Sequence, residues 1–166
     1  TVMAGDFLSP SLLGTLKWEG ERIKGKQMVD VMNLSGFDLV TFGNHEFDID
    51  EASLQKRINE SKFEWISSNV LHVTKTQKEA FYKEVNGQKI AIPELRILPF
   101  TNPKGALLKI GLVAPCLPAN KVNFVEYKDI FQSVDLAMQQ IANGTDIQIA
   151  LSHLNMEDDI KMAKLN

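Results

Sequence analysis

The sequence has little cysteine and no long apolar run, and each absence excludes a class of protein. Its 166 residues contain one cysteine, Cys116, so a disulfide framework within the chain is excluded. Cys116 lies in the apolar segment 111–117 and is predicted to be a small buried side chain rather than a nucleophile. No stretch approaches the roughly 18 apolar residues of a membrane-spanning helix. No signal-peptide pattern is visible after Thr1.

An excess of charge of one sign is also lacking. The 18 Lys and Arg residues nearly balance the 21 Asp and Glu residues, which leaves a net charge of −3. A nucleic acid polymer is therefore not an expected partner, and no acidic block suggests a solvating tail. The hydrophobic fraction of 44% is ordinary for a globular protein, and the length suits one domain.

Short apolar segments alternate with amphipathic ones. Strands are predicted at 2–5, 37–42, 63–68, 108–114 and 146–151. Helices are predicted around 23–35, 50–61, 130–141 and 156–165, with Gly36 and Gly144 at two helix ends. The Asn86-Gly87 pair between two β-like runs predicts a hairpin. The alternation predicts an α/β layered domain, and the hairpin argues against a purely parallel sheet.

Three polar clusters each follow a predicted strand. They are residues 5–11 (GDFLSPS), residues 43–48 (GNHEFD) and residues 152–154 (SHL). Open α/β sheets place ligands at the carboxyl ends of their strands, so clusters far apart in sequence are expected to converge on one site.

The residue types in these clusters suit a divalent metal. Asp6 offers a carboxylate, Asn44 an amide oxygen and His153 an imidazole. Two such metals about 3.5–4 Å apart can clamp the attacking and leaving oxygens of a phosphoryl displacement. His45 lies three residues before Asp48, a spacing that lets the carboxylate orient the imidazole.

Each of these residues also has an ordinary structural interpretation. Asp6 after a glycine suits a turn or a helix cap, Asn44 after a glycine suits a turn, and His153 suits a structural role at a strand end. Only their shared position after strands favours a functional site.

Three other features receive a structural role. Residues 9–11 (Ser-Pro-Ser) are predicted to be a helix N-cap with Pro10 at the first helical position. His72 and Asp38 match no chemical pattern and are predicted to be surface residues.

The clusters resemble motifs of the calcineurin-like metallophosphoesterase superfamily, specifically its 5′-nucleotidase branch. Residues 5–11 resemble the aspartate loop of that family. Residues 43–48 resemble its asparagine–histidine loop, extended by Glu-Phe-Asp as in 5′-nucleotidases. Segments 37–42, 68–70 and 151–159 follow in the order of the family. The Asn-His-Glu-Phe-Asp string is highly specific, and the agreement spans nearly the whole chain.

The resemblance implies a four-layer sandwich of two mixed β-sheets flanked by helices. It implies a phosphomonoester hydrolase with two divalent metal ions (Mn, Zn, Mg or similar), in which a metal-activated water attacks phosphorus. Asp6 would bridge the two metals, Asn44 would ligate one metal and touch the substrate phosphate, and His153 would be a further ligand. His45, oriented by Asp48, would stabilise the transition state or the leaving group. The substrate would be a nucleotide or another phosphate ester, and the location periplasmic, secreted or at the cell surface.

The sequence also departs from the family pattern. No Asp-x-His motif precedes Asp6, and no Gly-His-x-His motif occurs before Asn166. Residues 1–166 are therefore expected to form a single incomplete domain, truncated at both ends, that is weakly active or inactive alone. The C-terminal domain that binds the nucleoside in full-length 5′-nucleotidases is likewise not expected within residues 1–166. Segment 87–109 is longer than the usual hairpin, and three prolines are predicted to break it: Pro93, Pro99 and Pro103.

Two alternatives stay open. The same residues would serve a phosphodiesterase or cyclic-nucleotide hydrolase of this superfamily, and substrate profiling separates the two reactions. A catalytically silent fragment or binding module is the other alternative, and the metal content of each chain distinguishes it from the enzyme.

Overall fold

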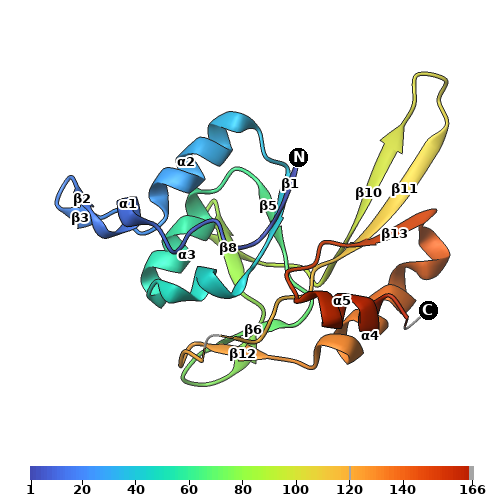
Figure 1. Cartoon of the computed structure of the whole chain (residues 1–166). Helices are drawn as coiled ribbons and strands as arrows, with labels where there is room; N and C mark the ends of the chain where they lie inside the picture. Colours follow the sequence, from blue (N-terminus) through green and yellow to red (C-terminus); the bar gives the residue numbers. More distant parts are fainter. Residues whose placement is uncertain (120, 165–166) are drawn as a thin grey trace.

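A computed structural model describes residues 1–119 and 121–164, which form a mixed α/β structure (Figure 1). Its strands are β1 (Val2–Ala4), β2 (Lys17–Trp18), β3 (Glu21–Arg22), β4 (Leu39–Thr41), β5 (Glu64–Ile66), β6 (Val70–Val73), β7 (Lys78–Glu79), β8 (Tyr82–Val85), β9 (Gln88–Ala91), β10 (Leu95–Thr101), β11 (Leu107–Val113), β12 (Val125–Tyr127) and β13 (Ile147–Ala150). Its helices are α1 (Leu12–Thr15), α2 (Lys26–Ser35), α3 (Glu51–Glu60), α4 (Ile130–Ile141) and α5 (Met156–Met162), with two 3-10 helices, η1 (Asn44–Asp48) and η2 (Ala142–Gly144). The predicted helix end at Leu165 lies outside the described residues.

The first sheet is parallel and has the order β1-β4-β5. Val40 of β4 and Trp65 of β5 are buried in the main core together with side chains of α2 and α3. Leu39 and Ile66, at alternate positions of the same strands, lie in a second apolar cluster on the opposite face. Burial on both faces explains why the sequence of β4 is almost entirely apolar.

The second sheet has the order β10-β11-β13, with β10 antiparallel and β13 parallel to β11. Leu112 packs with Leu39 and Ile66 of the first sheet. Its neighbour Val113 packs on the other face with Ile141 and other residues of α4. The layers therefore run from α2 and α3 through the first sheet and the second sheet to α4. This arrangement confirms the α/β class and the two-sheet sandwich flanked by helices.

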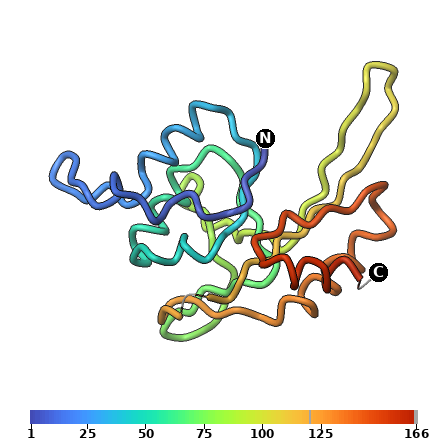
Figure 2. The backbone as a smooth tube through the Cα atoms, in the orientation of Figure 1, coloured from blue at the N-terminus to red at the C-terminus, as the bar shows by residue number. Residues whose placement is uncertain are grey.

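The β10–β11 hairpin projects away from the body of the molecule (Figures 1 and 2). Pro99 lies inside β10, so the prediction that it breaks the strand is wrong. The strand continues because β10 is at the edge of its sheet, where a residue without an N–H group is tolerated. The hairpin's outward position also leaves the first half of β11 exposed, although this strand was predicted to be buried.

Local signals in the sequence place several chain reversals correctly. Gly36 ends α2 in the left-handed conformation at φ 69°, and its N–H donates to Met32 O. Asn86 and Gly87 join β8 to β9 at φ 52° and φ 77°. At α1, however, Ser11 is the N-cap and Leu12 the first helical residue, so Pro10 precedes the cap instead of following it.

His72 is buried, which contradicts its predicted surface position. It lies on the same face of β6 as the buried Val70, because inward positions alternate along this central strand. Its Nε2 lies 2.7 Å from Glu51 Oε1, and its ring stacks on Phe81. Asp38 is at the surface as predicted, with its side chain 73% exposed. The contact of Nε2 with Glu51 and the stacking on Phe81 make a buried imidazole tolerable here, although Nδ1 is buried without a hydrogen-bond partner among the described residues.

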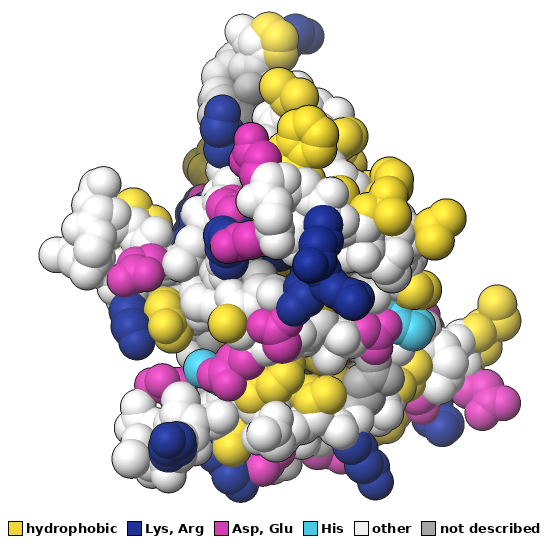
Figure 3. Space-filling view, turned by 90° about the vertical axis from the view of Figure 1, so that its left-hand side faces the viewer, with side chains coloured by type: hydrophobic (Ala, Val, Ile, Leu, Met, Phe, Trp, Pro, Cys, Tyr) yellow, Lys and Arg dark blue, Asp and Glu magenta, His cyan; other side chains and the backbone are white. Residues whose placement is uncertain are grey.

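The surface carries both signs of charge. Figure 3 shows acidic and basic side chains interspersed over the face that carries the β2–β3 hairpin, in agreement with the small net charge. Across residues 1–119 and 121–164, none of the helices combines the length and the apolar character required to cross a bilayer.

Candidate metal centre and its histidine–aspartate pair

Strand ends bring the three polar clusters together. Asp6 follows β1 and Asn44 follows β4, and these strands are parallel neighbours that pair Ala4 with Thr41. His153 follows β13 of the second sheet. A β-bridge to Cys116 holds the backbone of His153 against the extension of β11. The expected convergence therefore arises from pairing within one sheet and from the stacking of the two sheets.

Three electron-pair donors meet at this point. His153 Nε2 lies 3.1 Å from Asp6 Oδ2 and 3.3 Å from Asn44 Oδ1. The other ring nitrogen, Nδ1, lies 2.6 Å from the carbonyl oxygen of Ala4. In a neutral imidazole that carbonyl requires the proton on Nδ1, so Nε2 turns a lone pair toward the two oxygens. Such convergence of a carboxylate, an amide oxygen and an imidazole lone pair suits a divalent cation.

The donor set forms only part of a metal coordination shell. Among the residues whose positions are described, 1–119 and 121–164, no three side chains of the His, Cys, Asp or Glu types gather closely enough to hold a metal ion. The third donor here is the amide of Asn44. Asp6, Asn44 and His153 thus fit one metal position with open coordination sites, and two positions would need further ligands.

A histidine–aspartate pair lies beside these donors. His45 Nδ1 is 2.6 Å from Asp48 Oδ2, and this hydrogen bond raises the pKa of His45 above its ordinary value. Ser9 Oγ donates to the same carboxylate oxygen at 3.3 Å. The His45 side chain is 40% exposed, so its outer nitrogen is accessible to a substrate. A histidine that is oriented in this way, and whose protonated form is favoured, can stabilise negative charge or donate a proton.

Glu46 is a site residue that the sequence reasoning missed. Its carboxylate is fully buried and accepts four backbone hydrogen bonds, which come from Gly43, Asp6, Phe7 and Leu8 at 2.6–3.0 Å. Burial raises the pKa of Glu46, while the four backbone donors oppose that rise. Its position three residues after Gly43 is the capping-box spacing, which was the available signal in the sequence.

The two loops approach each other so closely that glycine is required on both sides. A Cβ atom at Gly5 would lie 2.3 Å from Gly43 N, and one at Gly43 would lie 2.2 Å from Asp6 Oδ1. Asp6 adopts the left-handed conformation at φ 57°, which costs a residue with a side chain roughly 1–3 kcal/mol. His45 N donates to Asp6 Oδ1 at 2.9 Å and helps to hold it there.

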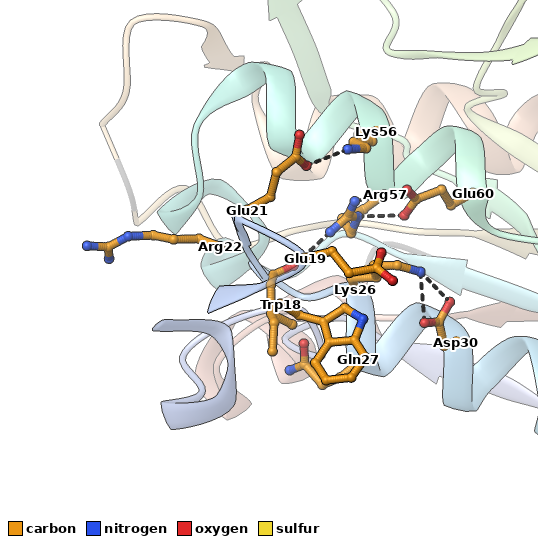
Figure 4. A pocket seen from close by; sticks show the side chains of 11 residues that line it. Trp18, Glu19, Glu21, Arg22, Lys26, Gln27, Asp30, Lys56, Arg57 and Glu60 are labelled. Atoms are coloured by element: carbon orange, nitrogen blue, oxygen red, sulfur yellow. Dashed lines mark hydrogen bonds and ion pairs between the residues drawn. The ribbon is translucent and has the colours of Figure 1, made fainter. Parts of the chain in front are cut away.

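A large surface hollow of about 660 Å³ lies away from this site, between the β2–β3 hairpin, α2 and α3 (Figure 4). Six of the eight charged side chains that line it are paired with each other: Lys56 with Glu21, Arg57 with Glu60 and Lys26 with Asp30. The hollow contains neither the metal-donor residues nor the histidine–aspartate pair, so its size does not indicate the reactive site.

The burial of Cys116 supports the prediction that this cysteine is structural. It is 0% exposed, and burial raises the pKa of its thiol above the usual range. A thiol in that state is a poor nucleophile.

Comparison with known proteins identifies similar sequences. No model of a known protein family matches the chain. A probable 5′-nucleotidase of Treponema pallidum is 26% identical over 97% of the chain, and an NAD 5′-nucleotidase of Haemophilus influenzae is 29% identical over 97%. A 2′,3′-cyclic-nucleotide 2′-phosphodiesterase/3′-nucleotidase of Haemophilus influenzae is 27% identical over 82%. The chain spans only 25%, 24% and 21% of these relatives, respectively.

Solved structures show the same fold. The calcineurin-like phosphoesterase YfkN of Bacillus subtilis matches 91% of the chain with a TM-score of 0.66 at 24% identity, over 47% of its own length. The 5′-nucleotidase precursor of Thermus thermophilus matches 86% with a TM-score of 0.65 at 21% identity, over 26% of its length. The sulfate thiohydrolase SoxB of Thermus thermophilus matches 99% with a TM-score of 0.74 at 18% identity, over 27% of its length. The chain therefore has the fold of the calcineurin-like phosphoesterases and is similar over nearly its whole length to 5′-nucleotidases.

Proposed function

We propose that this chain provides part of the catalytic centre of a metal-dependent phosphomonoester hydrolase that acts on nucleotides. The observation that carries the proposal is the approach of His153 Nε2 to Asp6 Oδ2 at 3.1 Å and to Asn44 Oδ1 at 3.3 Å, beside the His45–Asp48 pair. The names of the similar proteins support nucleotides as substrates.

The proposed roles follow from the position of each side chain. Asp6, Asn44 and His153 would hold a divalent ion, which supplies Lewis-acid polarisation and an activated water when bound. The Asn44 side chain would also contact the substrate phosphate. His45, whose protonated form is favoured by Asp48, would place a positive charge and a proton near the leaving oxygen. Removal of one such stabilising group typically costs about 100-fold in kcat.

The remaining ligands of a two-metal centre are proposed to come from elsewhere in a longer polypeptide. Residues 1–166 would then form one incomplete metallophosphoesterase domain, with a separate domain that binds the nucleoside. The coverage of only about a quarter of the similar proteins supports this division. A periplasmic, secreted or cell-surface location is proposed from the family resemblance, and fractionation of cells tests it.

The test is a substrate and metal assay of the intact protein. We expect Mn²⁺-dependent release of phosphate from 5′-AMP, together with one or two bound metal ions per chain. Removal of the metal by a chelator should abolish turnover, and Mn²⁺ should restore it. Intact protein that binds no divalent metal and releases no phosphate would refute the proposal.

Phosphodiester hydrolysis is the second candidate reaction. The similarity to a 2′,3′-cyclic-nucleotide phosphodiesterase/3′-nucleotidase favours it, and the same donor residues would serve. Faster turnover of 2′,3′-cyclic AMP or bis-p-nitrophenyl phosphate than of 5′-AMP would identify this reaction. The small donor set also favours a catalytically silent module, which zero bound metal would indicate.

A further inference from the structure

The loops of the site contain a fully buried carboxylate, that of Glu46. Glu46 is 0% exposed, and the proposed metal chemistry gives it no role because its oxygens face the protein backbone. Oε1 accepts from Phe7 N at 2.8 Å and Leu8 N at 3.0 Å. Oε2 accepts from Asp6 N at 2.7 Å and Gly43 N at 2.6 Å. These four hydrogen bonds all come from backbone donors of the two loops.

The need for this carboxylate arises from the close approach of the loops. At Gly5 and Gly43 the backbones approach so tightly that neither position has room for a Cβ atom. Successive N–H groups in such a turn form a concave group of donors that favours an anion. Without an acceptor, these donors would be buried and unsatisfied, which is costly for the fold.

The same carboxylate bonds to the backbone of the proposed metal ligand. Asp6 has φ 57°, a conformation that persists only when several contacts impose it. Two hydrogen bonds contribute to this: Asp6 N donates to Glu46 Oε2, and His45 N donates to Asp6 Oδ1. With Oδ1 fixed by His45, Oδ2 is the oxygen that points at His153. Glu46 thereby acts on the direction of Oδ2 through the backbone of residue 6.

We propose that Glu46 is a positioning residue of the metal centre, which sets the Asp6 carboxylate and the Asn44 amide in register for one metal ion. This inference rests on the proposed function, because it assigns Glu46 a role in metal affinity. Glu46 touches no substrate and is not a catalytic residue. Groups that orient metal ligands from behind typically change metal affinity by about 10–100-fold when they are replaced.

The test compares Glu46→Gln with Ile141→Ala in the intact protein. Glu46→Gln keeps the side-chain shape but directs an NH₂ group at two of the backbone donors. Ile141→Ala removes a buried side chain from a different apolar cluster, around α4, and controls for general destabilisation. Mn²⁺ affinity is measured from the electron paramagnetic resonance signal of free Mn²⁺. Thermal midpoints and amide hydrogen exchange at Asp6, Phe7, Leu8 and Gly43 are measured in parallel.

The expected result is a loss of Mn²⁺ affinity of about 10–100-fold in Glu46→Gln, with faster exchange of those amides and no loss in Ile141→Ala. Unchanged affinity in Glu46→Gln overturns the inference, as does an equal loss of affinity in both variants. If Glu46→Gln does not fold, Glu46→Asp allows the same comparison, because it keeps the charge but shortens the reach. Failure of the unsubstituted protein to bind Mn²⁺ refutes the proposed function itself, and the inference with it.

Discussion

Replacement of Gly43 by alanine should separate the two loops that form the metal centre. The backbone of Gly43 at φ −99° and ψ −179° is accessible to alanine, so the substitution tests contact rather than backbone strain. The new Cβ would lie 2.2 Å from Asp6 Oδ1 and 2.6 Å from Asp6 N. An ordinary contact distance requires the loops to part by about 1 Å, and overpacking of this kind typically costs about 1–3 kcal/mol.

That separation has two measurable consequences. The thermal midpoint should fall by roughly 2–12 °C, because each kcal/mol corresponds to about 2–4 °C in a domain of this size. Phosphatase activity of the intact protein should fall by about 100-fold, since a displacement near 1 Å is sufficient to cost that much. The two assays are differential scanning calorimetry and Mn²⁺-dependent hydrolysis of 5′-AMP.

Gly144→Ala is the matched control, because a Cβ at Gly144 meets no atom within 4 Å and its φ is not in the left-handed region. This variant should stay within about 0.5 kcal/mol of the unsubstituted protein and keep its activity. Gly43→Ala protein with normal stability and normal Mn²⁺ affinity would refute the claim that glycine at this position sets the distance between the loops.

Three further predictions test other parts of the structure. His45→Ala should lower kcat by about 100-fold with the metal content nearly unchanged, whereas Asp6→Ala should lose metal. Plasma emission spectrometry measures the metal content of both variants. Metal loss in His45→Ala would contradict the proposed division of roles. The bond with Lys24 holds the pKa of Asp50 well below its usual range. The ionised Asp50 therefore stabilises the fold at pH values above its unfolded pKa of about 4, and this stabilisation is lost as the pH falls toward the folded pKa. Asp50→Asn keeps the N-cap acceptor and should lower the free energy of unfolding by less than about 1 kcal/mol at pH 7. Urea unfolding should show that this difference from the unsubstituted protein shrinks below pH 4. A difference that is constant with pH would argue against a charge effect. Residues 1–166 expressed alone should hydrolyse 5′-AMP far below the typical enzyme range of about 1–1,000 s⁻¹, and turnover within that range would show that the three donors suffice.

The sequence by itself determined most of the local elements and indicated the side chains of the candidate site. Gly36 predicts the end of α2 because a residue without Cβ adopts the left-handed conformation at little cost. The Asn86-Gly87 pair predicts the β8–β9 hairpin for the same reason. The polar clusters after β1 and β4 predict one shared edge, because the carboxyl ends of neighbouring parallel strands coincide. These signals depend on contacts within a few residues, or on a rule that holds for all parallel sheets.

Only the tertiary structure decided which atoms meet. The 3.1 Å approach of His153 Nε2 to Asp6 Oδ2 depends on the stacking of two sheets, and neither local segment encodes that stacking. The burial of His72 depends on the face of β6 that covers the core, and a single polar residue in a short strand does not reveal it. Glu46 has the residue type of a solvated surface side chain, yet it is fully buried because four backbone N–H groups from two loops need one acceptor. Hydrogen-bond satisfaction between distant segments is a property of the folded chain, and it explains why this position was missed.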